Sequence, residues 1–448
     1  MSMWTRERRE AEEGRLSSFD AGERRAALEA LAGAAHAGEI ALPPARDQVN
    51  LHAHTFYSYN AYGYSPSAFA WMARTEGLSA AGIVDFDVLD GVDEFLGAAR
   101  RLDLRGVAGL ETRVFIPEFA SRAINSPGEP GISYHMGVGF AASVPPPPCR
   151  PFLQRIRRIG ADRNRGMVER VNAFLRPVEL DYDRDVLPLT PSGNATERHL
   201  CLAYARRAAA LFPDLAALTG FWTDKLTADA SKLDLPEGPD LQARIRARTM
   251  KKGGAGYVRP EHGAFPGLAE TNRFIAAAGA IPTMTWLDGT SDGEAAIDEL
   301  LDVETGCGSA VLNIIPDRNF TPGVRDRKRD LLEDIIGRAR ARGLPIVVGT
   351  EMNAPGNRFV DRFESDALRP FWPVFREGAM IVFAHTVLQA AGEMGYLSDW
   401  ARRRFPSLAQ RNEWFAEAGS RIPPSRVPAA GALDPSMTPD DVLRRAGA

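Results

Sequence analysis

Residues 49–55 read VNLHAHT, a short apolar run that carries His52 and His54. Successive side chains of a strand point to opposite faces, so a strand here would place both imidazoles on one face. Two imidazoles on one face at a strand end can bind a single metal ion. An H-x-H pair alone is more often two hydrogen-bonded histidines than a pair of ligands, so its meaning depends on the surrounding sequence.

Further apolar runs that end in polar residues follow this stretch, and helix-like segments separate VNLHAHT and the next two runs from one another. The runs are AAGIVDFD (80–87), GVAGLETRVF (106–115), YHMGVGF (134–140), LPIVVGTEMN (344–353) and AMIVFAHT (379–386). The helix-like segments are SPSAFAWMARTEG (65–77) and GVDEFLGAARRL (91–102). Strands that alternate with helices are the signature of a parallel α/β sheet.

The composition along the chain predicts five parts. They are a charged helical lead-in (1–46), the first part of a barrel (47–149), a helical insertion rich in Arg, Ala and Leu (150–262), the second part of the barrel (263–400) and a helical, proline-rich tail (401–448). The strand-and-helix rhythm stops at the prolines of 145–148 and resumes after the insertion.

Residue types that bind metals recur in these apolar runs. They are Asp85 and Asp87, Glu111, His135, Glu351 and Asn353, and His385. In parallel α/β barrels the active site forms at the C-terminal ends of the strands. The recurrence of such residues at several strand ends therefore indicates one convergent site.

These motifs resemble the PHP superfamily, the polymerase-associated and histidinol-phosphatase metal hydrolases. The residues that follow the family order are the H-x-H-T of 52–55, Asp85 after an apolar run, the G-x-E of 109–111, the histidine of YHMGVGF, and GTEMN (349–353), which is similar to a late G-S-D-x-H. ERHLCLAYARRA (197–208) and KKGGAGYV (251–258) resemble the helical insertion of a branch that includes nucleotide-directed phosphoesterases. The resemblance covers about residues 47–355. It implies an α/β fold, a distorted (β/α)7 barrel of PHP type with a helical insertion domain, and up to three metal ions.

The resemblance also implies metal ligands. The first metal site would consist of His52, His54, Glu111 and Glu351, where Glu351 replaces an aspartate of the family. A second site would share Glu111 and use His135. Histidine and carboxylate without cysteine suit Zn, Mn or Fe.

Other ligands of the family are missing from this chain. Phe86 and Trp286 stand where the resemblance would place histidines, and Asn353 stands at the final histidine of the third site. Tyr59 or Asn60 falls at another ligand of that site. Phenyl and indole rings cannot coordinate a hard cation, so we expect one or two divalent ions. We also expect Phe86 and Trp286 to form an apolar wall beside the metal, on which a sugar-like ring could stack.

Substrate-binding and catalytic candidates complete the expected site. Arg198 and His199 lie near a predicted helix start, where free N–H groups favour anions, and a similar Arg-His step faces the active site in the resembling branch. Arg163 and Arg165 could join them, although they are typical of ordinary surface arginines. The candidates for acid/base catalysis are Asp85, Asp87, Asp288 and His385.

The composition limits the class of protein. The chain has 448 residues and a formal net charge of −4, so it has no basic excess with which to bind a nucleic-acid duplex. Its three cysteines form no C-x-x-C pair. It has no apolar run of signal-peptide type and none long enough to span a membrane. These features favour a cytoplasmic protein with a small-molecule substrate and indicate nothing about its oligomeric state.

The sequence therefore predicts a metal-dependent, phosphoesterase-like hydrolase of a small phosphorylated or anionic metabolite. Two alternatives stay open. One is a single-metal lyase or isomerase that acts on a sugar-like substrate, because fewer ions weaken the machinery of phosphoryl hydrolysis. The other is a non-catalytic PHP-like binding protein.

Overall fold

The computed structural model describes residues 4–260, 263–316 and 325–447, so the ends of the expected lead-in, insertion and tail lie outside the described residues. Its centre is a seven-stranded sheet in which neighbours follow the chain order β1 to β7. The strands are β1 Val49–Ala53, β2 Ala80–Phe86, β3 Arg105–Phe115, β4 Ile132–Val138, β5 Ile281–Trp286, β6 Val311–Ile314 and β7 Ile346–Val348. A bridge between Ala53 and Glu351 joins the two edges, so the sheet is a nearly closed barrel.

One strand differs from the parallel sheet that the sequence predicted. β4 runs antiparallel to both β3 and β5, while the other neighbouring pairs are parallel. A parallel partner needs a crossover, usually through a helix. The connection from β3 to β4 contains only the short 3-10 helix η1 (Pro117–Phe119), so the chain returns beside β3 in the opposite direction.

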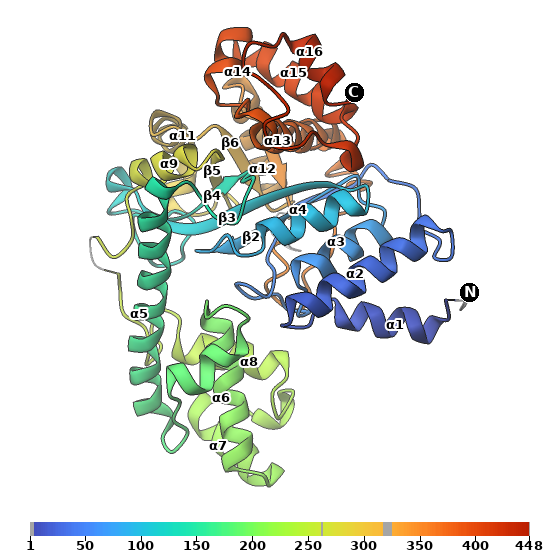
Figure 1. Ribbon diagram of the computed structural model, residues 1–448. Helices are drawn as coiled ribbons and strands as arrows, with labels where there is room; N and C mark the ends of the chain where they lie inside the picture. The colour runs from blue at the N-terminus through green and yellow to red at the C-terminus, as the bar shows by residue number, and fades with distance from the viewer. Residues whose placement is uncertain (1–3, 261–262, 317–324, 448) are drawn as a thin grey trace.

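Helices cover the outside of the barrel. The sequence signals of two of these helices, α3 and α4, are clear. Ser65 caps the N-terminus of α3 by accepting a hydrogen bond from the Ala68 N–H. α4 has acidic residues in its first turn and arginines in its last turn, which suits the helix dipole. The helices of this layer are α3 Pro66–Thr75, α4 Val92–Arg101, α9 Leu268–Ala277, α10 Asp292–Ala295, α11 Ile297–Gly306 and α12 Arg325–Ala341. The N-terminal helices α1 Arg6–Arg15 and α2 Ala21–His36 lie beside α3 and α4 (Figure 1).

The segment AMIVFAHT, predicted to be a strand, lies inside the helix α13 (Trp372–Gly392). Residues 378–388 of this helix are all buried, because it packs between β7 and the C-terminal helices. A helix that is buried on every side is apolar on every side. A short stretch of such a helix has the same apolar sequence pattern as a buried strand, so the sequence alone cannot distinguish the two. The C-terminal helices are α14 Asp399–Arg404, α15 Leu408–Arg421 and α16 Pro439–Arg445.

The first four α-helices that follow β4 form a helical group with its own core. Trp222, Tyr204 and Leu200 are fully buried in that core, which is separate from the two cores of the barrel. The helices are α5 Arg150–Leu175, α6 Glu197–Leu211, α7 Leu215–Leu226 and α8 Pro239–Thr249. Figure 1 shows α5 reaching from the sheet to α6–α8, which lie at the opposite end of the molecule from α13–α16. In the described part of the chain, no helix is long and apolar enough to cross a membrane.

Candidate active site

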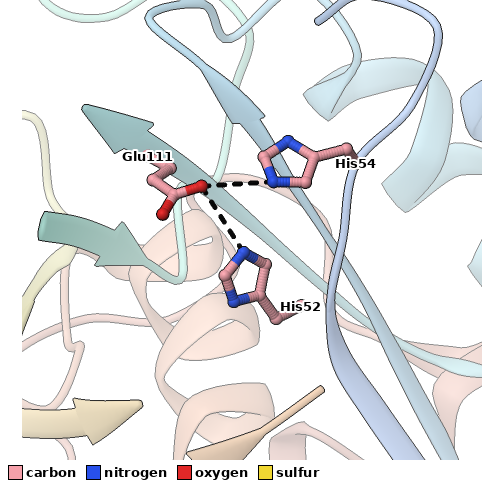
Figure 2. A group of neighbouring side chains, drawn as sticks. All are labelled: His52, His54 and Glu111. Carbon is pink, nitrogen blue, oxygen red and sulfur yellow. Dashed lines mark ion pairs between the residues drawn. The ribbon is translucent and has the colours of Figure 1, made fainter. Parts of the chain in front are cut away.

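Three side chains that the sequence selected as metal ligands converge at the end of the barrel. The Nε2 atoms of His54 and His52 lie 3.1 and 3.6 Å from the same oxygen, Oε2 of Glu111 (Figure 2). All three residues are buried. Among the described residues, this is the group of histidine, cysteine and carboxylate side chains whose donor atoms lie close enough to share a metal ion.

The backbone around β1 brings these residues together. The register between β1 and β2 shifts between Asn50 and Ala53, and such an irregularity re-aims side chains next to active sites. The chain after β7 packs directly against β1 at Gly349. A Cβ atom at this position would lie 2.4 Å from the backbone nitrogen of His52. Glycine therefore permits the close approach that completes the barrel beside the two histidines.

The ring nitrogens of the two imidazoles that lack hydrogen-bond partners indicate whether a metal ion fits this group. Neither ring nitrogen of His52 has a hydrogen-bond partner among the described residues, and Nε2 of His54 has none either. Buried polar atoms without partners are costly. Two imidazoles and a carboxylate are ligands that Zn, Mn and Fe accept, so these residues fit a divalent transition metal.

The electrostatics favour the ligand form of Glu111. Burial opposes ionisation, but the neighbouring imidazoles of His52 and His54 outweigh it and lower the pKa of Glu111 to about 2. Burial also favours a neutral His54 ring, yet Glu111, Asp85 and Glu351 together raise its pKa. The field around His54 is thus negative and would stabilise a bound cation.

A cavity of about 390 Å³ opens over this group. His54 and Glu111 line it at the barrel end, and residues of α5, α6 and α8 line it as well. Glu351 and Asn353 also line the cavity. The backbone of Glu351 bonds to β1, since its N–H donates to the carbonyl of His52 and its carbonyl accepts from the N–H of His54.

The wall formed by the insertion carries several cations, which we call the cationic wall: Arg163, Arg198, Arg246 and Lys251. Arg246 and Lys251 share one carboxylate, Glu197, at 2.8 and 2.7 Å. Burial opposes its ionisation, but Lys251 and Arg246 outweigh that effect and lower the pKa of Glu197 to about 2. One acid therefore neutralises only one of these two cations.

Arg198 has no hydrogen-bond or ion-pair partner among the described residues. It lines the cavity and is half-buried. Burial and the nearby Arg246 lower its pKa from the usual value. Arg163 also lines the cavity and lies over the ring of Phe265, whereas Arg165 forms an exposed ion pair with Asp183. Of the arginines considered from the sequence, Arg198 and Arg163 thus face the cavity.

The two aromatic residues expected beside the metal lie on different sides of their strands. Phe86 stacks on the imidazole of His54, with ring centroids 4.9 Å apart and planes at 14°, and lines the cavity. Trp286 does not. It is buried in the hydrophobic core, while its neighbours Thr285 and Leu287 line the cavity. The expectation for Trp286 is corrected because alternation along β5 points its indole away from the site.

His135 also faces away from the cavity. Its Nε2 lies 2.6 Å from Asn272 Oδ1, and its Nδ1 lies 3.6 Å from Glu304 Oε2. These partners belong to α9 and α11, which cover the outside of the barrel. The preceding residue, Tyr134, lines the cavity instead. The expected second metal site at His135 is therefore not formed by this arrangement.

Three other candidates are placed outside the cavity. Asp288 pairs with Lys328 at 2.8 Å. His385 lies within α13, where its Nδ1 accepts a hydrogen bond from the Tyr396 N–H. His199 accepts a hydrogen bond from the Thr196 N–H through its Nδ1 and so caps the start of α6. Each side chain has a structural partner that the sequence pattern did not identify.

The two aspartates at the end of β2 have different positions. Asp87 lines the cavity and accepts a hydrogen bond from Thr112 Oγ1 at 2.6 Å. Its burial is the main reason that its pKa is raised to about 6. Asp85 does not line the cavity and accepts hydrogen bonds from Thr55 and Ser58.

Sequence reasoning missed several residues of the site. Ser58, Tyr134, Thr285, Arg246 and Lys251 all line the cavity. Tyr134 and Thr285 are next in sequence to His135 and Trp286, which the sequence analysis had chosen. The sequence did not show which face of each strand points into the cavity. The KKGG segment that contains Lys251 was recognised, but its side chains were not assigned to the site.

Comparisons with known proteins identify relatives of the fold. No protein-family model and no curated protein matches the chain. An amidohydrolase from Chromobacterium violaceum, solved with bound sulfate and no metal, is 18% identical, with a TM-score of 0.51 over 74% of this chain and 96% of that one. A protein from Bifidobacterium adolescentis, described as a metal-dependent phosphoesterase, is 17% identical, with a TM-score of 0.45 over 74% and 98%. The first similarity supports the nearly closed seven-stranded α/β barrel with many helices.

Proposed function

We propose that this protein is a metal-dependent hydrolase of PHP type that cleaves a phosphoester of a small anionic metabolite. The observation that carries the proposal is the arrangement of His52, His54 and Glu111. Their donor atoms converge without other hydrogen-bond partners beside a cavity that His54 and Glu111 line together with the cationic wall. A hydrolase class also agrees with the fold shared with the amidohydrolase.

His52, His54 and Glu111 would hold one divalent metal ion, and Glu351, which lines the same cavity, offers a further carboxylate. Such an ion supplies a water of lowered pKa and a Lewis acid for a phosphoryl oxygen. Phe86 covers one face of the His54 ring and so keeps water from that side of the ligand.

The cationic wall would bind the anionic part of the substrate. Arg198 is the strongest candidate because no acid pairs with it among the described residues, and guanidinium binds phosphate through two parallel hydrogen bonds. Arg163 and the Arg246–Lys251 pair add positive charge on the same wall. Asp87 is the candidate to hold or accept a proton at its carboxylate, because it lines the cavity beside Thr112.

A single-metal lyase or isomerase is the second candidate, and the position of His135 favours it. With His135 turned toward α9 and α11, the described residues form one metal group and not two. Phosphoester hydrolysis often relies on two ions that clamp the attacking and leaving oxygens. One ion can still polarise a carbonyl for proton transfer.

One experiment separates the two candidates. Purified protein is loaded with Mn²⁺ or Zn²⁺, its metal content is measured, and phosphate release is followed on a panel of phosphorylated sugars and nucleotides. Release that disappears in the Glu111→Gln variant is expected for the hydrolase. Metal-loaded wild-type protein that releases no phosphate from any member of the panel would contradict the phosphoesterase assignment and favour the lyase or isomerase.

A further inference from the structure

His54 contacts a serine through the ring nitrogen that does not face Glu111. Its Nδ1 lies 3.0 Å from Ser58 Oγ, and Ser58 Oγ lies 2.7 Å from Asp85 Oδ1. The three residues are at most 1% exposed, so water does not compete for these contacts. Asp85 comes from the end of β2, and the turn after β1 supplies Ser58. The two strands thus build a buried chain of hydrogen bonds behind His54.

The hydrogens in this chain have one consistent arrangement. The Thr55 N–H donates to Asp85 Oδ1 at 2.7 Å, so this oxygen is an acceptor whether or not the other carboxyl oxygen is protonated. Ser58 has a single hydroxyl hydrogen and donates it to the same oxygen. The remaining lone pairs of Ser58 then face His54, so Nδ1 of His54 must carry the hydrogen that bonds to them.

When the His54 ring is neutral, this arrangement leaves its Nε2 with a lone pair. That lone pair faces a carboxylate oxygen of Glu111 at 3.1 Å. Two acceptors at this distance repel one another unless a cation lies between them. His52 lacks any such support, since neither of its ring nitrogens has a hydrogen-bond partner among the described residues. His54 is thus the better oriented of the two imidazole ligands.

We propose that Ser58 and Asp85 are positioning residues that hold His54 in its Nδ1–H tautomer and so prepare Nε2 to bind a divalent metal ion. The proposal rests on the metal site of the proposed function. Partners of this kind fix the orientation and the tautomer of a histidine ligand, and their loss typically weakens metal binding by about 10- to 100-fold. Ser58 acts through its hydroxyl group as acceptor, and Asp85 acts by orienting that hydroxyl.

The first test measures the Kd for Mn²⁺ and Zn²⁺ by titration against a chromogenic chelator. Ser58→Ala removes the acceptor for Nδ1–H, so we expect roughly a 10- to 100-fold higher Kd. Ser58→Thr keeps the hydroxyl and should restore most of the affinity. Ser67→Ala is the matched control, because Ser67 is another buried serine that donates to a carboxylate, Glu94, but lies on α3. Its Kd should equal that of the wild type.

A Ser58→Ala variant that binds metal as tightly as the wild type would overturn the proposal. The melting temperature of each metal-free variant shows whether the fold is intact. If Ser58→Ala proves unstable, Asp85→Asn gives a second measure, since its side-chain oxygen can still accept from Ser58 and Thr55. We expect this variant to keep the tautomer and most of the metal affinity of the wild type, and loss of the Nδ1–H tautomer together with full wild-type affinity would overturn the proposal.

The second test reads the tautomer directly. The chain contains seven histidines, so ¹⁵N-histidine labelling gives few ring signals in long-range ¹H–¹⁵N spectra. In metal-free protein, at a pH at which the ring is neutral, His54 should carry its hydrogen on Nδ1. A neutral ring with hydrogen on Nε2 would overturn the proposal. If the wild type binds no metal at all, the proposed function fails while the tautomer test still stands, so the two failures are distinguishable.

Discussion

At the scale of single residues, the account depends on Glu111, because both histidines aim at one of its oxygens. The lowered pKa of Glu111 keeps it ionised in the folded protein. Without a cation, the two imidazoles surround a buried negative charge and three of their ring nitrogens have no hydrogen-bond partner among the described residues. The site therefore gains most from binding an ion that all three side chains share.

The first prediction follows from this geometry. Glu111→Gln and His52→Ala should each remove most of the bound metal, because each takes away one of three ligands. Metal content after dialysis is measured by inductively coupled plasma mass spectrometry. His135→Ala is the control, since its ring bonds to Asn272 outside the cavity, and it should retain the metal. Equal metal loss in all three variants would mean that the ligand set is wrong.

The second prediction concerns the cationic wall. Arg198→Ala should raise KM for a phosphorylated substrate by about tenfold or more, since a hydrogen bond to a charged group contributes roughly 1.5–3 kcal/mol, and it should leave metal content unchanged. Arg165→Ala provides the matched control, because Arg165 pairs with Asp183 on the surface. If KM stays the same in Arg198→Ala, Arg198 does not bind the substrate.

At the scale of secondary-structure elements, the close contact between β1 and the end of β7 holds the site together. Gly349 allows this contact, since an added Cβ would also lie 2.6 Å from Asn50 Oδ1. The displaced backbone would carry His52 with it. Metal binding should thus depend on a residue that has no side chain.

The third prediction tests that contact. Gly349→Ala should lower the free energy of unfolding by about 1–3 kcal/mol, as overpacking does, and should weaken metal binding. Gly337→Ala, in α12, is the control: an added Cβ there has nothing within 4 Å, and helix propensity should stabilise the variant by up to about 1 kcal/mol. Denaturant unfolding and metal titration check both. A Gly349→Ala variant with wild-type stability and affinity would contradict this role of the contact.

The elements also show what the sequence could predict. The H-x-H stretch, the apolar runs and Glu111 predicted the barrel, because strands of a barrel present polar residues at one end. The face of β4 and of β5 could not be predicted, since a shift of one residue exchanges the two faces. This is why Tyr134, and not His135, lines the cavity. The pattern of 379–386 could not reveal α13, because that helix is buried all around.

At the scale of the whole molecule, the cavity joins two units with separate cores. The barrel supplies the group of His52, His54 and Glu111 that we propose as the metal site, and the insertion supplies the cationic wall. The formal net charge of −4 gives no hint of this local concentration of arginine and lysine. Arg163, Arg198 and Arg246 lie far apart in the sequence, and folding brings them to one surface.

The fourth prediction concerns metal removal. A chain with cores of this size does not need an ion to fold, so a chelator should leave the secondary structure unchanged by circular dichroism. Binding of the ion should still raise the melting temperature by a few degrees, because a ligand at 100 times its Kd stabilises the folded state by about 2.7 kcal/mol. Unfolding of the wild type by the chelator at room temperature would instead assign the metal a structural role.

The central claim is that His52, His54 and Glu111 bind one metal ion at the base of the cavity. Anomalous diffraction from crystals grown with Zn²⁺ tests it most directly. The account predicts one anomalous peak within about 2.0–2.2 Å of Nε2 of each histidine and of an oxygen of Glu111. A crystal without a peak there, or with its strongest peak beside His135, would contradict the account.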